Sequence, residues 1–286
     1  MRRRNSALLL QLFLLLLAGC GATRAAPTAA PTRPIATLFP TAAADAQGTA
    51  PPAATPIPDT GWQPGRLGVE LRRVQASAPG RSAIPLTIVR LDPTRVRLRV
   101  AYAPDQPRGL RSWFEERRPL AAINGGFFTP AFQATALLIS DGVASGASYD
   151  GFGGMLAIAP DGGVSLRALR DQPYDPGEAL DQALQSFPML VFPGGEPAAL
   201  EDDRRRARRS VVALDRDGRV LLLASPTSDF TLRGLADWLS RSDLAVDRAL
   251  NLDGGSSTGL YLSDGALQEA IDSFGPLPIV LLVEPK

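Results

Sequence analysis

The stretch Asn251-Leu252-Asp253-Gly254-Gly255-Ser256-Ser257-Thr258-Gly259 predicts a β-strand that ends in a turn of glycines and hydroxyl side chains. Because side chains alternate between the two faces of a strand, Leu250 and Leu252 are expected in the core, with Asn251 and Asp253 on the opposite face. The paired glycines let the backbone approach a ligand closely. A carboxylate, an amide and open backbone N–H groups at one strand end can hold the oxygens of a sugar or a phosphate. We therefore interpret this stretch as the floor of an active site.

Part of the same stretch, residues 255–259, also matches the G-x-S-x-G nucleophile elbow of the α/β-hydrolases. That mechanism requires a histidine base, and the sequence contains no histidine. A serine–lysine pair is equally unsuitable, because the only lysine is the last residue, Lys286. No Gly-Lys-Ser/Thr sequence is present, which excludes a Walker phosphate loop.

A second strand is expected to end with the same chemistry. The apolar residues 120–123 lead directly into Asn124-Gly125-Gly126. If this strand lies beside the first one, Asn124 and Asn251 would line one pocket. Asn-Gly-Gly is also favourable turn chemistry, and spacing alone leaves both interpretations open.

One arginine stands out from the densest charge run of the chain, residues 201–209. Most of that run is interpreted as a solvated loop. Arg209, however, directly precedes a strand predicted over residues 210–214, so its position would be fixed by a sheet. A fixed guanidinium can form two parallel hydrogen bonds to phosphate oxygens.

Most of the remaining sequence is typical of β-strands, with few helices. Residues 95–102 alternate between arginine and apolar side chains, as in a half-exposed antiparallel strand. Apolar residues at helical spacing predict helices over residues 110–117 and after the N-cap Thr231. Residues 181–185 are expected to form a helical turn before a strand over residues 186–192. Further strands are expected over residues 67–74, 84–91, 137–139, 155–159, 220–224, 260–262 and 279–283. This pattern predicts an α+β fold, with a mixed, largely antiparallel β-sheet and a few helices packed on it in a single globular domain.

The first residues resemble a bacterial lipoprotein signal. Arg2, Arg3 and Arg4 precede an apolar run over residues 7–17, which is too short to span a bilayer comfortably, and Cys20 follows. Residues 1–19 are therefore predicted to be removed, leaving the protein outside the cytoplasm and lipid-anchored to the membrane through Cys20. The alternative is an ordinary cleaved signal peptide with a chance cysteine.

Composition limits the remaining chemistry. Cys20 is the only cysteine, so no disulfide and no cysteine-based zinc site can form within the chain. Any metal would need oxygen ligands. Loss of the three arginines of the signal would lower the formal charge from +1 to −2, and such near-neutrality argues against nucleic acid or a polybasic membrane contact as a partner.

A linker is expected to separate the anchor from the globular part. Residues 20–64 are rich in alanine, threonine and proline and have too few large apolar side chains to offset the entropy lost on ordering. The globular domain is then predicted to span residues 65–286.

Four motifs in order resemble the phosphodiester glycosidase family, typified by the lysosomal uncovering enzyme, which removes N-acetylglucosamine from a sugar phosphodiester. The resemblance covers roughly residues 66–284, and Phe187 stands where many members have a smaller residue. The motifs are Asn124-Gly125-Gly126-Phe127-Phe128, Gln185-Ser186-Phe187-Pro188-Met189-Leu190-Val191, Arg209-Ser210 ahead of a strand followed by Asp215 and Gly218, and Asn251-Leu252-Asp253-Gly254-Gly255-Ser256-Ser257.

The resemblance implies hydrolysis of a glycosyl-1-phosphodiester. Phosphate is already a good leaving group, so charge neutralisation and activation of water matter more than acid catalysis. We expect Asp253 to act as base or nucleophile, Arg209 to hold the phosphate, and Asn124 and Asn251 to orient sugar hydroxyls. The expected catalytic residues are Asp253, Arg209 and Asn124, and the expected substrate-binding residues are Gly125, Gly126, Asn251, Gly254, Gly255, Ser256, Ser257 and Thr258.

Two other functions fit the same residues. The protein could be a surface lipoprotein that binds a phosphate-containing glycan without cleaving it. Alternatively, Asp253 and nearby hydroxyl and amide oxygens could hold a divalent cation such as calcium. A second catalytic carboxylate is not determined by the sequence, and the candidates are Asp150, Asp229 and Glu201.

Overall fold

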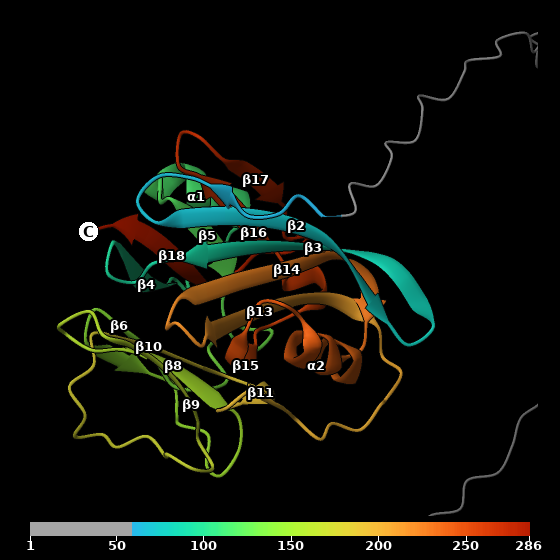
Figure 1. Cartoon of the computed structure of the whole chain (residues 1–286). Helices are drawn as coiled ribbons and strands as arrows, with labels where there is room; N and C mark the ends of the chain where they lie inside the picture. The colour runs from blue at the N-terminus through green and yellow to red at the C-terminus, as the bar shows by residue number, and fades with distance from the viewer. Residues whose placement is uncertain (1–58) are drawn as a thin grey trace, which may run out of the picture. The chain divides into compact units, whose positions relative to one another are not determined.

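A computed structural model of the chain describes residues 59–286. The predicted signal, Cys20 and most of the predicted linker lie outside these residues, so the expectations made for them stay predictions. The described part forms three β-sheets, two α-helices and one short 3₁₀ helix (Figure 1). No helix in it is long and apolar enough to cross a membrane.

The largest sheet has eight strands in the order β1-β2-β3-β14-β13-β15-β11-β12. All of its neighbouring strands run antiparallel. The strands are β1 (Gln63–Pro64), β2 (Val69–Ala78), β3 (Arg81–Leu91), β11 (Met189–Phe192), β12 (Glu196–Pro197), β13 (Ala207–Asp215), β14 (Val220–Phe230) and β15 (Val246–Asn251). Of the three strands predicted to form the site, the two that carry Arg209 and Asn251, β13 and β15, are therefore direct neighbours.

Two five-stranded sheets complete the β structure, and their strand pairs are antiparallel as well. One has the order β17-β16-β5-β18-β4 and the other β7-β6-β10-β8-β9. The first contains β4 (Val96–Tyr102), β5 (Ala121–Asn124), β16 (Leu260–Ser263), β17 (Gln268–Ile271) and β18 (Ile279–Pro285). The second contains β6 (Leu138–Ser140), β7 (Val143–Ser145), β8 (Gly154–Ile158), β9 (Val164–Ala168) and β10 (Gln182–Ser186).

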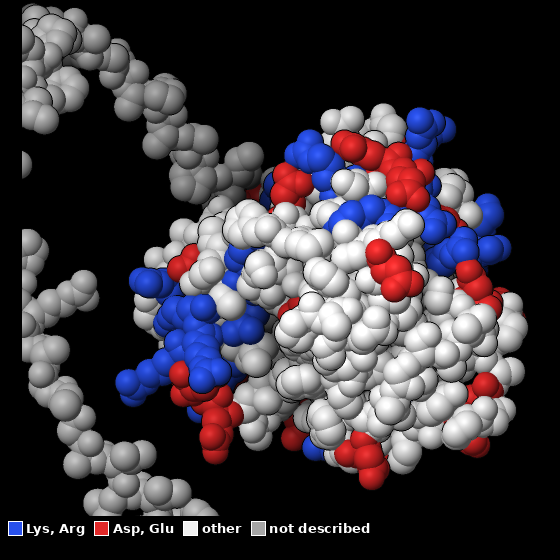
Figure 2. All heavy atoms as spheres, turned by 180° about the vertical axis from the view of Figure 1, so that it is seen from behind, with Lys and Arg blue, Asp and Glu red and all other residues white. Residues whose placement is uncertain are grey.

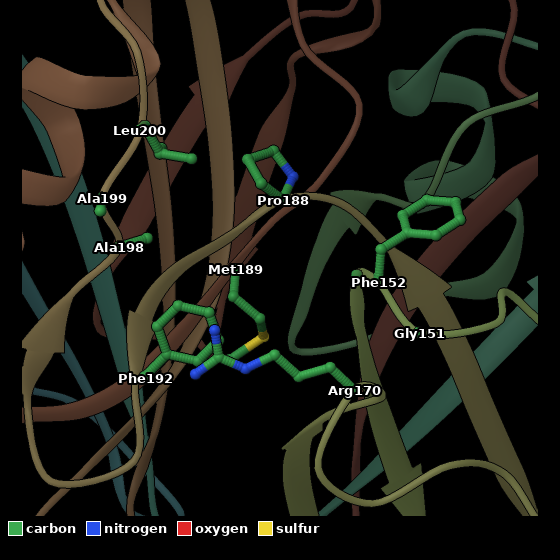
Figure 3. A pocket seen from close by; sticks show the side chains of 10 residues that line it. Gly151, Phe152, Arg170, Pro188, Met189, Phe192, Ala198, Ala199 and Leu200 are labelled. Carbon is green, nitrogen blue, oxygen red and sulfur yellow. The ribbon is translucent and has the colours of Figure 1, made fainter.

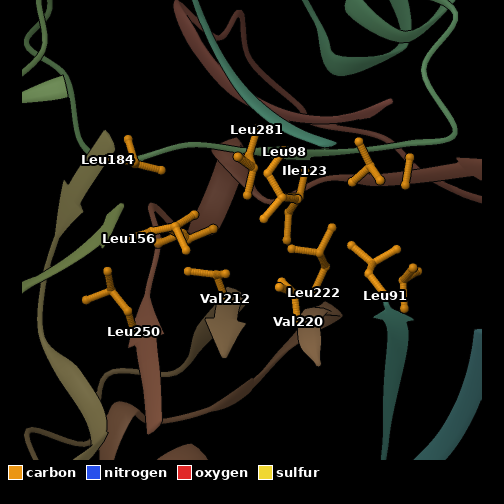
Figure 4. Packing of buried hydrophobic residues seen from close by; sticks show 14 of the residues in the cluster. Leu91, Leu98, Ile123, Leu156, Leu184, Val212, Val220, Leu222, Leu250 and Leu281 are labelled. Atoms are coloured by element: carbon orange, nitrogen blue, oxygen red, sulfur yellow. The ribbon is translucent and has the colours of Figure 1, made fainter. Parts of the chain in front are cut away.

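The main hydrophobic core lies between the large sheet and the two smaller ones. Figure 4 shows Val212 and Leu222 of the large sheet facing Leu98, Ile123 and Leu281 of the sheet that contains β5 and β18. These side chains are at most 1% exposed. Burial of this many aliphatic side chains supplies the main stabilisation of the fold and holds the three sheets together.

The two helices cover the outer faces of two sheets. Helix α1 (Leu110–Arg117) buries Leu110 and Trp113 on the sheet that contains β5, and Arg118 in the left-handed conformation ends it before Pro119. Helix α2 (Leu232–Arg241) packs on the large sheet, and Thr231 caps it by accepting a hydrogen bond from Gly234 N at 3.0 Å. The predicted α+β class and both predicted helices are confirmed.

One predicted helical turn is wrong. Residues 181–185 mostly form β10, the middle strand of its sheet, with β6 and β8 on either side. All five residues of β10 are buried. The strand pairing on both sides stabilises an extended backbone, and this tertiary effect overrides the weak local helical preference.

The folded part begins earlier than the predicted boundary at residue 65. Asp59 accepts two hydrogen bonds from Arg72, at 3.0 Å from Nε and 2.6 Å from Nη2. Trp62 lies under the guanidinium of Arg90, with 3.8 Å from Cζ to the ring centroid. Residues 59–64 thus belong to the edge of the large sheet, because polar and aromatic contacts compensate for their low apolar content.

Charged side chains are spread unevenly over the face seen in Figure 2. Lysine and arginine side chains gather in separate groups there, and a broad area between them carries few charges. Acidic side chains adjoin these groups, so charges of both signs lie side by side on this face.

Candidate active site

The ends of β13 and β15, two of the three strands predicted to form the site, lie side by side. Val211 of β13 pairs with Asn251 of β15, so Arg209 and Asp253 come opposite each other at the end of this antiparallel pair. Leu252 N donates to Ser210 O at 2.9 Å, which continues the pairing beyond β15. Leu250 and Leu252 are fully buried in the main core. The predicted alternation of this stretch is confirmed.

Asn124 lies beneath the strand ends and connects them. Its Nδ2 donates to Asp253 O at 2.7 Å and to Gly125 O at 3.3 Å. Its Oδ1 accepts from Ser210 Oγ at 2.7 Å and from Gly259 N at 3.1 Å. An asparagine amide has two donor hydrogens and two acceptor lone pairs, so every hydrogen-bonding position of the side chain is used.

This position corrects the role predicted for Asn124. The residue does converge with Asp253 and Arg209, but its side chain is fully buried and has no free group for a sugar hydroxyl. Asn124 therefore positions the site and does not contact substrate in this arrangement. The predicted substrate contact required an open pocket above the amide, and that space is occupied by neighbouring strands.

Gly125 and Gly126 are also structural rather than ligand-facing. Both are buried. A Cβ on Gly125 would lie 2.4 Å from Ile279 Cγ2, and one on Gly126 would lie 2.8 Å from Gln185 O. Their backbones are tied as well, since Gly125 O accepts from Asp253 N at 3.1 Å. The glycines are needed because three strands meet here, which corrects their predicted role in substrate binding.

Asp253 is the carboxylate of the site. Its Oδ1 accepts from Gly254 N at 2.9 Å, and no arginine or lysine forms an ion pair with it among residues 59–286. Burial raises the pKa of the Asp253 carboxyl, and the Ser257 hydroxyl and the Gly254 N–H offset part of that effect. A carboxyl with a raised pKa in a partly buried site is suited to proton transfer.

The turn after Asp253 lies directly on β13. A Cβ on Gly254 would lie 2.9 Å from Arg208 O, so only glycine permits this close approach. The 3₁₀ helix η1 (Gly255–Ser257) follows, with Ser256 exposed and Ser257 buried. Thr258 is fully buried, and its hydroxyl has no hydrogen-bond partner in the described structure. Of the three hydroxyl side chains predicted to bind substrate, Ser256, Ser257 and Thr258, Ser256 alone is exposed.

Arg209 is held in place by backbone oxygens on the same side as Asp253. Its Nε donates to Phe230 O at 3.2 Å and its Nη2 to Arg205 O at 2.8 Å. Its Nη1 has no partner among the described residues and would lie 3.9 Å from a Cβ on Gly254. Burial lowers the pKa of the half-buried Arg209 guanidinium, and the charge of Asp203 partly offsets this effect.

A second arginine, Arg208, was not singled out from the sequence. It is 5% exposed, and its Nη2 donates to Asp272 O at 2.8 Å, while Nε and Nη1 are buried without partners in the described structure. Phe274 covers it at 3.9 Å from Cζ to the ring centroid. A run of arginines before a strand gives no signal that one of them will be buried.

Asn251 keeps one group unpaired. Its Nδ2 donates to Phe187 O at 2.8 Å, and its backbone N donates to Pro188 O at 3.0 Å. Its Oδ1 is buried and has no partner among residues 59–286, and the same is true of Ser186 Oγ. Buried polar atoms without partners are uncommon and costly, which makes both oxygens candidates for contact with a ligand hydroxyl.

Four aromatic side chains, which we call the aromatic wall, lie beside this strand end. They are Phe127, Tyr149, Phe152 and Phe187. Their ring centroids are 4.5 Å apart for Phe127 and Phe187, and 4.6 Å apart for Tyr149 and Phe152. Phe127 and Phe187 belong to motifs identified in the sequence, but no sequence pattern indicated that Tyr149 and Phe152 would join them.

An apolar pocket of about 290 Å³ adjoins the wall without containing Asp253 or Arg209. Figure 3 shows Phe152 and Pro188 on its border and the guanidinium of Arg170 over the ring of Phe192, at 3.8 Å. The pocket therefore meets the candidate site only through Phe152 and the Phe187–Pro188 segment. It can extend a binding site but cannot hold the reacting atoms.

The candidates for a second carboxylate differ in their surroundings. Asp229 forms an ion pair with Arg81 at 3.3 Å. Asp150 and Glu201 are exposed, and neither has an ion-pair partner within the described part of the chain. No group of three or more Asp, Glu, Cys or His side chains that could hold a metal ion occurs in residues 59–286.

The bonds of Asn124 predict a stability effect. Replacing Asn124 by Ala would leave Ser210 Oγ, Gly259 N and Asp253 O without their buried partner, so we expect a loss of about 3 kcal/mol or more in the free energy of unfolding. Urea denaturation followed by circular dichroism measures it. Ser210→Ala, which removes one of these bonds, should cost about 1 kcal/mol. Unchanged stability of Asn124→Ala with loss of function would instead indicate direct substrate contact.

The raised pKa of Asp253 predicts a pH-dependent stability difference. Below the ordinary aspartate pKa of about 3.9 the carboxyl is protonated in both the folded and the unfolded state. As pH rises toward and through the raised folded-state pKa, the unfolded state releases its proton first, so the wild type loses stability relative to Asp253→Asn. Melting temperatures of both proteins between pH 4 and pH 8 should therefore diverge, with the variant higher at neutral pH. A constant difference would contradict a raised pKa.

Comparison with known proteins agrees with this architecture. The family model for phosphodiester glycosidases matches residues 117–283. No match was found among curated protein sequences. The catalytic domain of zebrafish N-acetylglucosamine-1-phosphodiester alpha-N-acetylglucosaminidase, auto-inhibited by its pro-peptide, has a similar fold, with a TM-score of 0.57 and 19% identity over 76% of this chain and 83% of that one.

Two further structures share the fold. A hypothetical protein from Synechocystis has a TM-score of 0.52 and 16% identity over 77% of this chain, and the chain spans 62% of that protein's length. A Burkholderia pseudomallei protein described as exported has a TM-score of 0.53 and 14% identity, over 73% of this chain and 76% of that one. The family match covers more than half of the chain and includes Asn124, Arg209 and Asp253. The chain belongs to the phosphodiester glycosidase family.

Proposed function

We propose that this protein is a hydrolase that cleaves a sugar from a glycosyl-1-phosphodiester. The observation that carries the proposal is the register of β13 and β15, in which Val211 pairs with Asn251, so that Arg209 and Asp253 fall at opposed positions just beyond that pair. One side chain is a carboxyl whose pKa is raised by burial, and the other is a guanidinium with an unpaired Nη1. Attack at an anomeric carbon requires a group that accepts a proton, and release of phosphate requires a group that stabilises negative charge. Asp253 and Arg209 supply these two groups.

The reaction follows from these two groups. In its ionised form Asp253 takes a proton from water while the water oxygen forms a bond to the anomeric carbon. The bond between that carbon and the phosphate oxygen breaks, and its electron pair leaves with the phosphate. Arg209 stabilises the departing phosphate, because its planar guanidinium matches the phosphate oxygens and is half-buried. Direct attack by Asp253, followed by hydrolysis of the glycosyl-enzyme, is the alternative course.

The site of action is proposed to be the outside of the cell. The basic and apolar residues before Cys20 support export and lipidation. The substrate would then be a phosphodiester of a cell-surface or extracellular glycan. The membrane would be contacted through the lipid alone.

The anchor has its own test. Cells that express the full chain would be grown with a labelled fatty acid, and we expect label in the wild-type protein and none after Cys20→Ser. Secreted, unlabelled wild-type protein would show an ordinary signal peptide instead.

The catalytic proposal predicts strong effects at both paired residues. With a sugar-1-phosphate methyl ester as substrate, the wild type should release free sugar and methyl phosphate. Asp253→Asn and Arg209→Gln should each lower the turnover rate by roughly a hundredfold or more. Arg205→Gln is the matched control, because it removes the same charge from the loop that precedes β13, its side chain is 88% exposed, and only its backbone oxygen contacts Arg209.

The alternatives give different results in the same assay. Binding of the ester without turnover by the wild type would identify a glycan-binding module. Loss of turnover after exhaustive chelation, with recovery on adding calcium, would identify a required cation. Full activity of Asp253→Asn would contradict the assigned role.

A further inference from the structure

We propose that the aromatic wall of Phe127, Tyr149, Phe152 and Phe187 is the subsite for the glycosyl ring of the substrate. The aromatic rings would select a pyranose that presents C–H groups on the face turned toward them. This inference rests on the proposed function, because it takes the phosphate to lie at Arg209 and the anomeric carbon at Asp253. It assigns a specificity role to side chains that take no part in the reaction itself.

The wall is continuous with the reacting end of the sheet. Gly125 O accepts from Asp253 N at 3.1 Å, and Phe127 follows two residues later. Phe187 O accepts from Asn251 Nδ2 at 2.8 Å. The rings of Phe127 and Phe187 are then 4.5 Å apart. Each of these two rings is thus fixed through the backbone to the strand end that carries Asp253.

The loop that supplies the other two rings is packed tightly against the same place. Gly153 has a φ of +75°, and a Cβ there would lie 2.6 Å from Ser186 O and 3.5 Å from Phe187 Cβ. Tyr149 N donates to Gln185 Oε1 at 2.9 Å. Tyr149 and Phe152 are thereby brought within 5.7 Å and 6.0 Å of Phe187, both close to edge-on. Backbone packing and hydrogen bonds therefore hold the four rings of the wall in place.

The strand order gives the direction of the substrate. In the large sheet β13, β15 and β11 are consecutive, so Arg209, Asp253 and the Phe187–Pro188 segment lie in that order across the sheet. In a glycosyl-1-phosphodiester the anomeric carbon lies between the phosphate and the rest of the sugar. With phosphate at Arg209, the sugar ring therefore extends toward Phe187, and the aglycone extends the opposite way.

The exposure of the wall supports a ligand there. Phe152 is 50% exposed and Phe187 is 39% exposed. They are two of only five large apolar side chains that are exposed within residues 59–286. Adjacent exposed aromatic rings are unfavourable in water, and such patches mark binding surfaces.

A pyranose has an apolar face and a polar edge, and the aromatic wall and the polar atoms beside it match these two parts. One face of the ring presents C–H groups, which carry a slight positive charge and pack on the negative face of an aromatic ring. The hydroxyls at the ring edge need polar partners. Asn251 Oδ1 and Ser186 Oγ lie beneath this surface, next to Phe187 in space or in sequence, and have no hydrogen-bond partner within residues 59–286.

The test measures binding, so it does not depend on turnover. Affinities for glucose 1-phosphate, phenyl phosphate and inorganic phosphate would be measured by calorimetry on the wild type, Phe152→Ala and Phe187→Leu. We expect each substitution to weaken glucose 1-phosphate binding by roughly fivefold to tenfold, which is the size of one lost aromatic contact. Inorganic phosphate affinity should stay unchanged. Phe187→Leu keeps an apolar side chain of similar size, and Phe152 is half exposed, so both variants are expected to fold.

Val143→Ala serves as the control, because Val143 is 67% exposed on β7 and lies outside the wall. It should leave all three affinities unchanged. Weaker phenyl phosphate binding with unchanged glucose 1-phosphate binding would assign the wall to the aglycone and overturn the proposal. Unchanged glucose 1-phosphate affinity, or no binding of it by the wild type, would overturn it as well. A protein that binds glucose 1-phosphate through the wall but turns over no ester would contradict the proposed function alone.

Discussion

The hydrogen bonds of one buried amide hold the candidate site together. Asn124 ends β5 in one sheet, and its side chain bonds to Ser210 of β13 and to the backbone on both sides of the η1 turn. The chain passes from the large sheet to a smaller one at that turn. Loss of the amide would leave several buried groups unpaired at once, which costs far more than a single surface bond. The junction between the two sheets is therefore a specific contact as well as a hydrophobic one.

The same junction explains why glycines surround the site. Gly125, Gly126 and Gly254 each lie where an added Cβ would meet a neighbouring segment within 3 Å. This crowding brings Asp253 beside β13, so that Arg209 faces it from the neighbouring strand. Arg208, the preceding residue of β13, projects from the other face and is buried under Phe274. The close approach of the Gly254 backbone to β13, together with the alternation of side chains along β13, thus places Arg209 and not Arg208 on the same side as Asp253.

The sequence predicted the parts of the fold that depend on local pattern. The alternation in β4, the apolar stripe of α2 and the cap at Thr231 follow from periodicity and hydrogen bonding within a few residues. The repeated Asn-Gly-Gly chemistry raised the possibility that these strand ends meet, but spacing alone left it open. The sequence could not predict that Asn124 and its glycines face inward, because that depends on the distance between two sheets. The aromatic wall was hidden for a similar reason, since Tyr149 and Phe152 come from a loop without periodicity.

Burial of Asp253 lowers the stability of the folded protein but gives the carboxyl the raised pKa that suits proton transfer. Burial disfavours the ionised form of the Asp253 carboxyl and raises its pKa, so ionisation of this group costs stability in the folded state. A neutral residue would remove this cost and would also remove the carboxyl group that the proposed reaction uses. The fold tolerates this cost of ionisation because Asn124 and the main core, and not Asp253 itself, hold the surrounding backbone in place. A site arranged in this way keeps its geometry whether or not the carboxyl carries a proton, and this is what a group that accepts and returns protons requires.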